Sequence, residues 1–96
     1  MNNSKTQILL SINLQKGLAT SGECRKTTVL SESFVSYAVS NDGMKSTRLS
    51  QFKWKFMSKG QKIDTIIRTM VCDELKISDP KSLIVGKHYK WEFIDE

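Results

Sequence analysis

The chain has 96 residues, of which 39% are apolar and 26% are charged, and it carries a formal net charge of +5. This length predicts one domain spanning residues 1–96, and the composition excludes a wholly disordered chain. No apolar run approaches the roughly 20 residues of a membrane-spanning helix, and no signal peptide is recognised, so we expect a cytoplasmic protein without membrane contact.

The first predicted element is a strand over residues 6–15. Apolar side chains occur at every second position and alternate with mainly polar ones, which is typical of a strand with one buried face. They are Ile8, Leu10, Ile12 and Leu14. Residues 16–27 follow as a polar connector that contains Gly17 and Gly22.

Residues 28–40 allow two interpretations. A strand is preferred, because this segment combines β-branched residues with serines, which are poor helix formers. The alternative is a helix capped by Ser31. Its apolar face would then consist of Phe34, Val35, Ala38 and Val39. The following Asn41, Asp42 and Gly43 tolerate the positive φ of a tight hairpin turn, which favours the strand.

Two motifs in which aromatic and charged residues alternate dominate the second half of the chain. Residues 52–56 read FKWKF and residues 89–93 read YKWEF, and together they hold six of the eight aromatic residues. Side chains of a strand point alternately to its two faces, so each motif predicts three rings on one face and charges on the other. The first motif lies in a strand predicted over residues 46–57. The second lies in a strand that begins at Leu83 and is interrupted by Gly86.

An amphipathic helix is predicted between the two motifs, from Ser58 to about Lys76. Ser58 and Gln61 have the spacing of a capping box, in which each side chain accepts from the backbone of the other. The apolar positions form one stripe along the helix. They are Ile63, Ile66, Ile67, Met70, Val71 and Leu75. Pro80 ends the helical region. The stripe needs an apolar partner, for which the aromatic faces of the two motif strands are the candidates.

The predicted order of elements is β-β-β-α-β, or β-β-β-α-β-β if Gly86 divides the last strand. This describes an α+β domain in which a mostly antiparallel sheet of four to five strands carries one amphipathic helix on one face. The aromatic rings then belong to the core, and the lysines between them form a charged outer surface. The competing interpretation is an exposed platform for stacking bases. It would use Trp54, Phe56, Tyr89 and Trp91.

No motif of catalysis or metal binding is found. His88 is the only histidine, and it does not share a short zinc-ligand spacing with either cysteine, Cys24 or Cys72. Neither a nucleophile elbow nor a glycine-rich nucleotide loop is present. We therefore predict a non-enzymatic protein with no cofactor or metal, and we expect both cysteines to be reduced.

Basic residues are concentrated in the middle of the chain. Between Asp42 and Asp64 there are six basic residues and no acidic one. Such a field attracts phosphates or an acidic protein surface, although a solvated lysine face that only maintains solubility is an equally simple interpretation. Together with one lysine of the second motif, the predicted binding residues are Lys45, Arg48, Lys53, Lys55, Lys59, Lys62 and Lys90.

The preferred functional prediction is a small basic domain that contacts nucleic-acid phosphates through a lysine-rich sheet surface. The alternative is a protein-interaction module, such as an inhibitor or adaptor, for which the composition would also suit a phage or mobile-element origin. That module would act through the basic face or through a sheet edge. The strand over residues 6–15 is the candidate edge, which could pair with a partner or form a homodimer.

Overall fold

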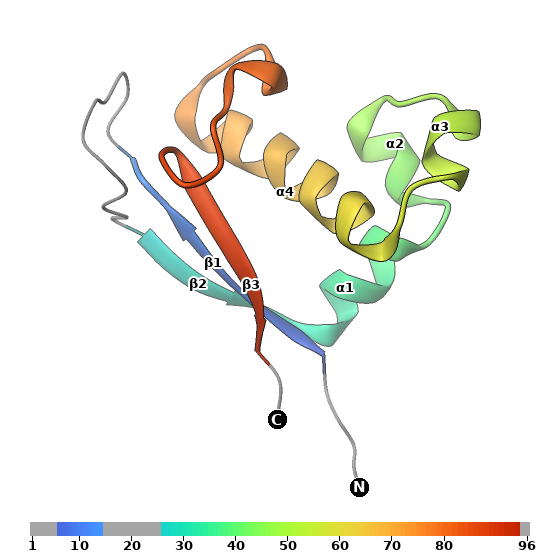
Figure 1. Cartoon of the computed structure of the whole chain (residues 1–96), viewed down its shortest axis with the longest axis horizontal. Helices are drawn as coiled ribbons and strands as arrows, with labels where there is room; N and C mark the ends of the chain where they lie inside the picture. Colours follow the sequence, from blue (N-terminus) through green and yellow to red (C-terminus); the bar gives the residue numbers. More distant parts are fainter. Residues whose placement is uncertain (1–5, 15–25, 95–96) are drawn as a thin grey trace, which may run out of the picture.

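The computed structural model describes residues 6–14 and 26–94, and it combines a sheet with several helices (Figure 1). The strands are β1 (Gln7–Ile12), β2 (Lys26–Leu30) and β3 (Tyr89–Ile94). The helices are α1 (Glu32–Val39), α2 (Gly43–Thr47), α3 (Gln51–Lys55), α4 (Lys59–Leu75) and the short 3-10 helix η1 (Pro80–Ser82). Most of the predicted connector over residues 16–27 lies outside the described residues.

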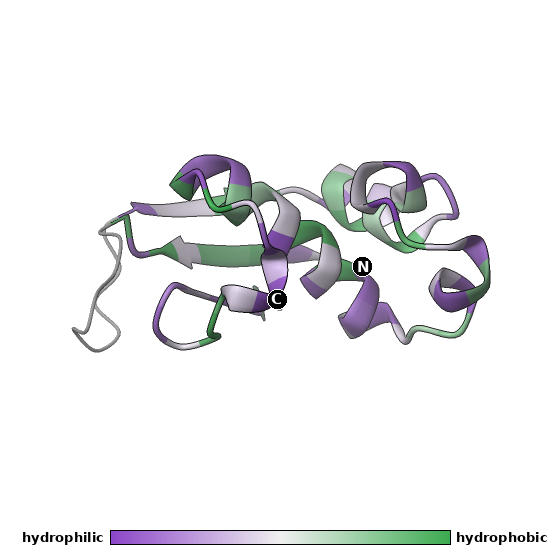
Figure 2. Ribbon diagram, turned by 90° about the horizontal axis from the view of Figure 1, so that it is seen from above, coloured by the Kyte–Doolittle hydropathy of each residue, from purple (hydrophilic) through white to green (hydrophobic). Residues whose placement is uncertain are grey.

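The predicted α+β class with an antiparallel sheet is confirmed. In the described part of the chain, however, the sheet has three strands instead of four or five, and several helices replace the single predicted one. The elements form successive tiers in which α4 lies between the sheet and the α2–α3 pair (Figure 1). The molecule is flat, with extents of 40 × 34 × 16 Å, as the view from above also shows (Figure 2).

The strand predicted first, β1, is the central strand of the sheet. The order is β2-β1-β3, and both strand pairs are antiparallel. The prediction that this strand forms a sheet edge is therefore wrong, because it is hydrogen-bonded on both sides and the edges are β2 and β3. The predicted apolar face is confirmed for Ile8, Leu10 and Ile12, which are buried. Ser11 on the other face is buried as well, and Leu14 lies beyond the strand and is exposed.

Residues 28–40 divide between a strand and a helix. β2 ends at Leu30, and α1 begins after Ser31, whose Oγ accepts a hydrogen bond from the backbone N–H of Phe34 at 3.4 Å. The strand prediction is wrong for α1, and the alternative of a helix capped by Ser31 is confirmed. The cap and the burial of Val35 and Ala38 on one side of the helix outweigh the weak intrinsic preference for a strand.

The strand predicted over residues 46–57 is wrong, because this region forms α2 and α3. The expected hairpin turn is absent as well, since Gly43 is the first residue of α2. α3 begins after Ser50, whose Oγ accepts from the backbone N–H of Lys53 at 3.2 Å. This cap satisfies one of the free donors at the helix start and favours helix over strand locally.

The amphipathic helix is confirmed as α4, including its capping box. The N–H of Gln61 donates to Ser58 Oγ at 3.2 Å, and the N–H of Ser58 donates to Gln61 Oε1 at 2.8 Å. The helix ends at Leu75, and the following Lys76 adopts a left-handed conformation with a φ of 58°. None of the described helices is both long and apolar enough to cross a membrane.

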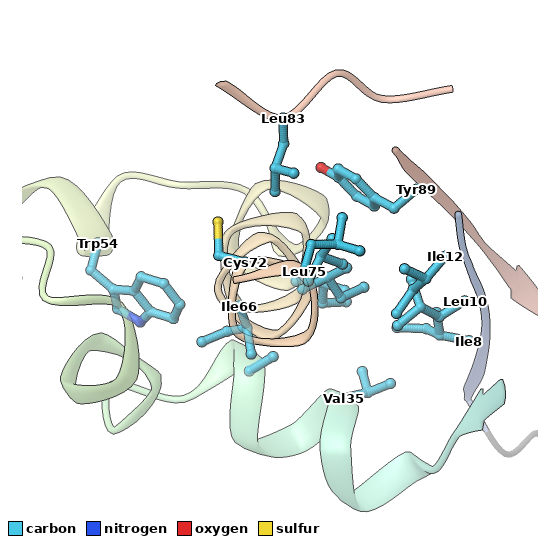
Figure 3. Close-up of a cluster of buried hydrophobic side chains, with 14 residues drawn as sticks. Ile8, Leu10, Ile12, Val35, Trp54, Ile66, Cys72, Leu75, Leu83 and Tyr89 are labelled. Carbon is cyan, nitrogen blue, oxygen red and sulfur yellow. The ribbon is translucent and has the colours of Figure 1, made fainter. Parts of the chain in front are cut away.

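The core surrounds α4 on two sides (Figure 3). The aliphatic residues of β1 and the ring of Tyr89 lie on one side, and Trp54 lies on the other. The predicted partner of the apolar stripe is thus confirmed only in part. The second motif contributes the buried ring of Tyr89 from the strand β3, whereas the first contributes the buried ring of Trp54 from the helix α3.

The last strand begins at Tyr89 and not at Leu83. Gly86 has a φ of 95°, which suits glycine, and it lies in a turn in which the N–H groups of Lys87 and His88 donate to the carbonyl of Ile84. The predicted interruption at Gly86 is therefore a turn that precedes β3. The second motif forms a strand as predicted.

Candidate functional site

The seven predicted binding residues do not form one surface. Four belong to α2 and α3 or end α2: Lys45, Arg48, Lys53 and Lys55. Lys59 and Lys62 lie in α4, and Lys90 lies in β3. The sheet location predicted for Lys53 and Lys55 is wrong, because both residues belong to a helix. Only Lys90 lies in the sheet.

Lys90 lies on the face of the sheet that points away from α4. Its neighbour Tyr89 is buried on the α4 side, and successive side chains of a strand point to opposite faces. Lys90 shares the outer face with Glu92, and both line a cavity of about 310 Å³. Because α4 separates the sheet from α2 and α3 (Figure 1), Lys90 is remote from the basic residues of those two helices.

The two lysines of α4 contact neighbouring elements. Lys59 Nζ lies 5.4 Å from the ring centroid of Phe93 in β3. Lys62 Nζ donates to the carbonyl oxygen of Val39 at 3.2 Å and lies 5.6 Å from the ring of Trp54. Lys62 is also partly buried. Its ammonium group therefore joins α4 to α1 and α3, and is less available to a ligand than the lysines of α3.

The first aromatic motif is divided by α3 into an inner ring and two outer rings. Trp54 is fully buried, whereas Phe52 and Phe56 are 71% and 74% exposed. The two phenylalanine rings are neighbours, with their centroids 5.0 Å apart and a tilt of 59°. Successive helical residues are about 100° apart, so Phe52 and Phe56 project together on the side opposite Trp54, and Lys53 and Lys55 flank them.

Trp54 attaches α3 to the rest of the fold. Its Nε1 donates to the carbonyl oxygen of Ser40 at 2.8 Å. A Cβ atom on Gly43 would lie 2.8 Å from Cζ2 of Trp54 and 3.2 Å from the carbonyl oxygen of Ala38. The start of α2 therefore approaches the indole as closely as a glycine allows. These contacts of Trp54 fix the position of α3, and with it the position of the outer rings of Phe52 and Phe56.

We define the α2–α3 surface as two rings and four basic side chains: Phe52, Phe56, Lys45, Arg48, Lys53 and Lys55. All six are exposed. The ion pairs within the described residues are Lys26–Glu74 and Asp64–Arg68, and neither involves this surface. Asp42 is the N-cap of α2, and no acidic residue follows it before Asp64, so α3 has no acidic residue of its own to offset its lysines.

A cavity of about 440 Å³ lies beside the α2–α3 surface, between the end of α2 and α4. Arg48 and Asp73 both line it, so its walls carry charges of both signs. Lys53 and Lys55 do not line it, and neither does either outer ring. Of the four basic residues of the α2–α3 surface, only Arg48 lines this cavity, and Lys45, Lys53 and Lys55 lie outside it.

A cluster of hydrogen-bonded side chains around Asp64 joins α4 to β3. Asp64 Oδ1 accepts from the hydroxyl of Tyr89 at 2.7 Å and from Nε1 of Trp91 at 2.9 Å. Its Oδ2 accepts from Nε of Arg68 at 2.9 Å, and Arg68 Nη1 donates to the carbonyl oxygen of Pro80 at 3.2 Å. The carboxylate thus connects the helix, the last strand and η1.

The titration of this cluster follows from its contacts. Burial, the hydrogen bond to Asp64 and the charge of that carboxylate raise the pKa of the Tyr89 phenol far above its ordinary value. Burial disfavours the charged guanidinium of Arg68, but the hydrogen bond and the charge of Asp64 raise its pKa overall. Tyr89 therefore stays a hydrogen-bond donor and Arg68 stays cationic. We interpret the cluster as the attachment of β3 to α4.

The rings of the second motif lie on one face, as predicted. Tyr89 is buried, Trp91 is partly buried, and Phe93 packs edge-on against Trp91 with a centroid distance of 5.4 Å. The core interpretation is confirmed for Tyr89 and Trp54 but is wrong for Phe52 and Phe56. The four-ring stacking platform is wrong, because its members face different parts of the molecule.

The histidine and the described cysteine have structural surroundings. His88 Nδ1 accepts a hydrogen bond from the backbone N–H of Ile84 at 2.9 Å. Cys72 is buried, and this burial, with the charges of Asp73 and Asp79, raises the pKa of its thiol. Cys24 lies outside the described residues. Within residues 6–14 and 26–94, no group of three or more potential metal-binding side chains is assembled.

The exposed ring pair is the feature that sequence reasoning missed. Phe52 and Phe56 are four residues apart, a spacing that places two side chains on one helix face. The sequence contained one indication of a helix here, because Ser50 precedes this pair at the position of an N-cap residue. The strand interpretation placed both rings on the same side as Trp54.

Comparison with known proteins finds no match: no protein family, curated protein or solved structure is significantly similar to this chain.

Proposed function

We propose that this chain is a small non-catalytic domain that binds nucleic acid through the α2–α3 surface. The observation that carries the proposal is the concentration of four exposed basic side chains on two adjacent short helices, within a segment that has no acidic residue between Asp42 and Asp64. Phosphate contacts of this type position a protein on nucleic acid without reading its sequence.

The structure-based proposal differs from the sequence-based one in the location of the contact. The outer sheet face carries Lys90 beside Glu92, so its local charges oppose each other. In the α2–α3 surface, Arg48 shares a cavity with Asp73, but Lys53 and Lys55 have no acidic residue within their own segment. A polyanion is therefore attracted to the helical end of the molecule in preference to the sheet.

A protein partner is the second candidate, and the exposed phenylalanine pair favours it. Large apolar side chains that are more than two-thirds exposed are common at protein-binding sites, where they enter apolar pockets. Such a partner would need an acidic rim to meet the lysines. It would give a discrete complex that survives nuclease treatment.

Charge reversal on α3 tests the proposed function. We expect Lys53→Glu/Lys55→Glu to weaken binding of a labelled oligonucleotide at least about tenfold at low salt, because it replaces two attractions by two repulsions. Fluorescence anisotropy at increasing salt measures the effect. For the unchanged protein, log K should fall linearly with log salt, with a slope of about −0.7 to −0.9 per phosphate contact.

The matched control is Lys87→Glu/Lys90→Glu, which changes the net charge equally but lies on the turn before β3 and on the outer sheet face. We expect it to retain affinity within about threefold. Equal losses in both double variants would show that only net charge matters. If the unchanged protein binds no oligonucleotide at low salt, the proposal is wrong.

Arg48 provides a prediction that separates binding from stability. It ends α2 in a left-handed conformation with a φ of 60°, and Lys76 ends α4 in the same way with a φ of 58°. Glycine adopts this conformation without strain, so Arg48→Gly and Lys76→Gly should each raise the free energy of unfolding by up to about 1 kcal/mol.

Only Arg48→Gly should also weaken oligonucleotide binding and reduce the magnitude of the salt slope by about one contact. Both variants remove one positive charge from a helix end, so Lys76→Gly controls for charge and strain together. Urea denaturation and the same anisotropy titration provide the measurements. A loss of affinity in Lys76→Gly as large as in Arg48→Gly would contradict the assigned surface.

A further inference from the structure

Resting on the proposed function, we infer that the α2–α3 surface selects unpaired bases. The rings of Phe52 and Phe56 stack on bases of a single strand, and the flanking Lys53 and Lys55 contact its phosphates. The ligand class is therefore single-stranded nucleic acid and not duplex. The inference uses the geometry of α3, and it goes beyond charge attraction, which would not distinguish the two forms.

The exposed rings have no role in the core. Phe52 and Phe56 are 71% and 74% exposed, and neither belongs to the buried cluster or to the partly buried side chains that pack against it. The two rings contact each other, with their centroids 5.0 Å apart. Trp54, on the opposite side of the same helix, provides the attachment of α3 to the fold (Figure 3). The outer rings are thus free to contact a ligand.

The geometry of the pair suits unpaired bases. The rings are tilted by 59° and are not stacked face to face, so they do not cover each other's faces fully. A base of a single strand can place its own face on such a ring. In a duplex the base faces are occupied by neighbouring pairs, and only base edges reach the grooves. A duplex would therefore leave the phenylalanine faces without a partner.

The placement of charge agrees with this ligand. Lys53 and Lys55 flank the rings on the two sides of α3, and Arg48 and Lys45 follow on the neighbouring α2. Each nucleotide of a single strand supplies a flat apolar face and a negative charge together. An extended strand thus meets both features of the surface, whereas a protein partner must combine an apolar pocket with an acidic rim.

The test measures binding of a labelled single-stranded oligothymidine and a labelled duplex of equal length by anisotropy. We expect the unchanged protein to bind the single strand more tightly. Phe52→Ala/Phe56→Ala should reduce single-strand affinity by roughly 5- to 150-fold for each stacked ring, should change duplex binding little, and should leave the salt slope unchanged. The denaturation midpoint should not change, because both rings are exposed.

Two further variants separate stacking from general apolar contact. Phe52→Tyr/Phe56→Tyr retains the aromatic faces and should bind the single strand as the unchanged protein does. Phe52→Leu/Phe56→Leu retains apolar character without an aromatic face and should resemble the alanine variant. Full affinity in the leucine variant would overturn the stacking assignment in favour of an apolar contact.

The remaining outcomes separate this inference from the proposed function. If single strand and duplex bind equally, and the phenylalanine variants bind as the unchanged protein does while Lys53→Glu/Lys55→Glu does not, the inference fails and the proposed function stands. If neither oligonucleotide binds at low salt, both fail. If sedimentation shows a dimer that only the alanine variant dissociates, the rings cover each other between two copies, and the inference is overturned.

Discussion

Replacing Trp54 by alanine is expected to lower the free energy of unfolding by about 3–5 kcal/mol, the usual range for removing a buried aromatic side chain. The indole is fully buried, its Nε1 bonds to the carbonyl oxygen of Ser40, and Lys62 Nζ lies 5.6 Å from its ring. Its loss would leave a cavity between α4 and the α2–α3 pair. Urea denaturation followed by circular dichroism measures the change.

The control for Trp54→Ala lies on the same helix. Phe52→Ala also removes an aromatic ring from α3, but this ring is exposed, so the free energy of unfolding should change by no more than about 0.5 kcal/mol. Trp54→Phe should lie between the two variants, because it retains a ring but loses the hydrogen bond to Ser40. A loss below about 1 kcal/mol in Trp54→Ala would mean that α3 is not attached through this ring.

The attachment of α3 also links stability to the proposed binding surface. Under conditions in which Trp54→Ala remains folded, we expect it to bind an oligonucleotide more weakly than the unchanged protein. The lysines and outer rings would all be present, but α3 would no longer be held in one position. Ordering α3 on binding would then cost conformational entropy.

Asp64→Ala is expected to lower the free energy of unfolding by about 2–4 kcal/mol, because hydrogen bonds to a charged group contribute more than neutral ones. The carboxylate accepts from Tyr89, Trp91 and Arg68, and its removal would leave three donors without their acceptor. The side chains of Asp64 and Arg68 are only 26% and 29% exposed, so water replaces the lost contacts incompletely. Urea denaturation of the purified variant measures the loss.

An exposed ion pair provides the control for Asp64→Ala. Lys26 and Glu74 lie 3.3 Å apart with side chains that are 45% and 40% exposed, so Glu74→Ala should change the free energy of unfolding by less than about 1 kcal/mol. Hydrogen exchange adds a local measurement, because Asp64→Ala should increase exchange mainly in β3. Equal effects of the two substitutions would contradict the role of Asp64 in attaching β3 to α4.

Three elements were predictable because their side-chain pattern and their environment agree. β1 buries its apolar residues at every second position, although Ser11 between them is buried as well, and the second motif places its rings on one face of β3. α4 has a capping box and a long apolar stripe, so its local signals and its packing point to the same structure. The apolar stripe of α4 is also long enough for its period to be unambiguous.

The two aromatic motifs show why the rest was not predictable. Both have aromatic residues at positions one, three and five, yet one forms a helix and the other a strand. Five residues fit either period. The decision depends on distant partners: Trp54 bonds to Ser40 beside Gly43, whereas Tyr89 and Trp91 bond to Asp64 while their backbone pairs with β1.

The sequence by itself determined the amphipathic α4, the alternation of β1 and β3, and the concentration of basic residues between Asp42 and Asp64, because each is a property of neighbouring residues. Only the tertiary structure decided which of those charges share a surface and which aromatic rings meet solvent. It separated Lys90 from Lys53 and Lys55, and it buried Trp54 while leaving Phe52 and Phe56 exposed. The physical reason is that the placement of these lysines and the exposure of these rings both depend on the helical conformation of α3. Contacts between residues that are remote in the sequence stabilise that conformation.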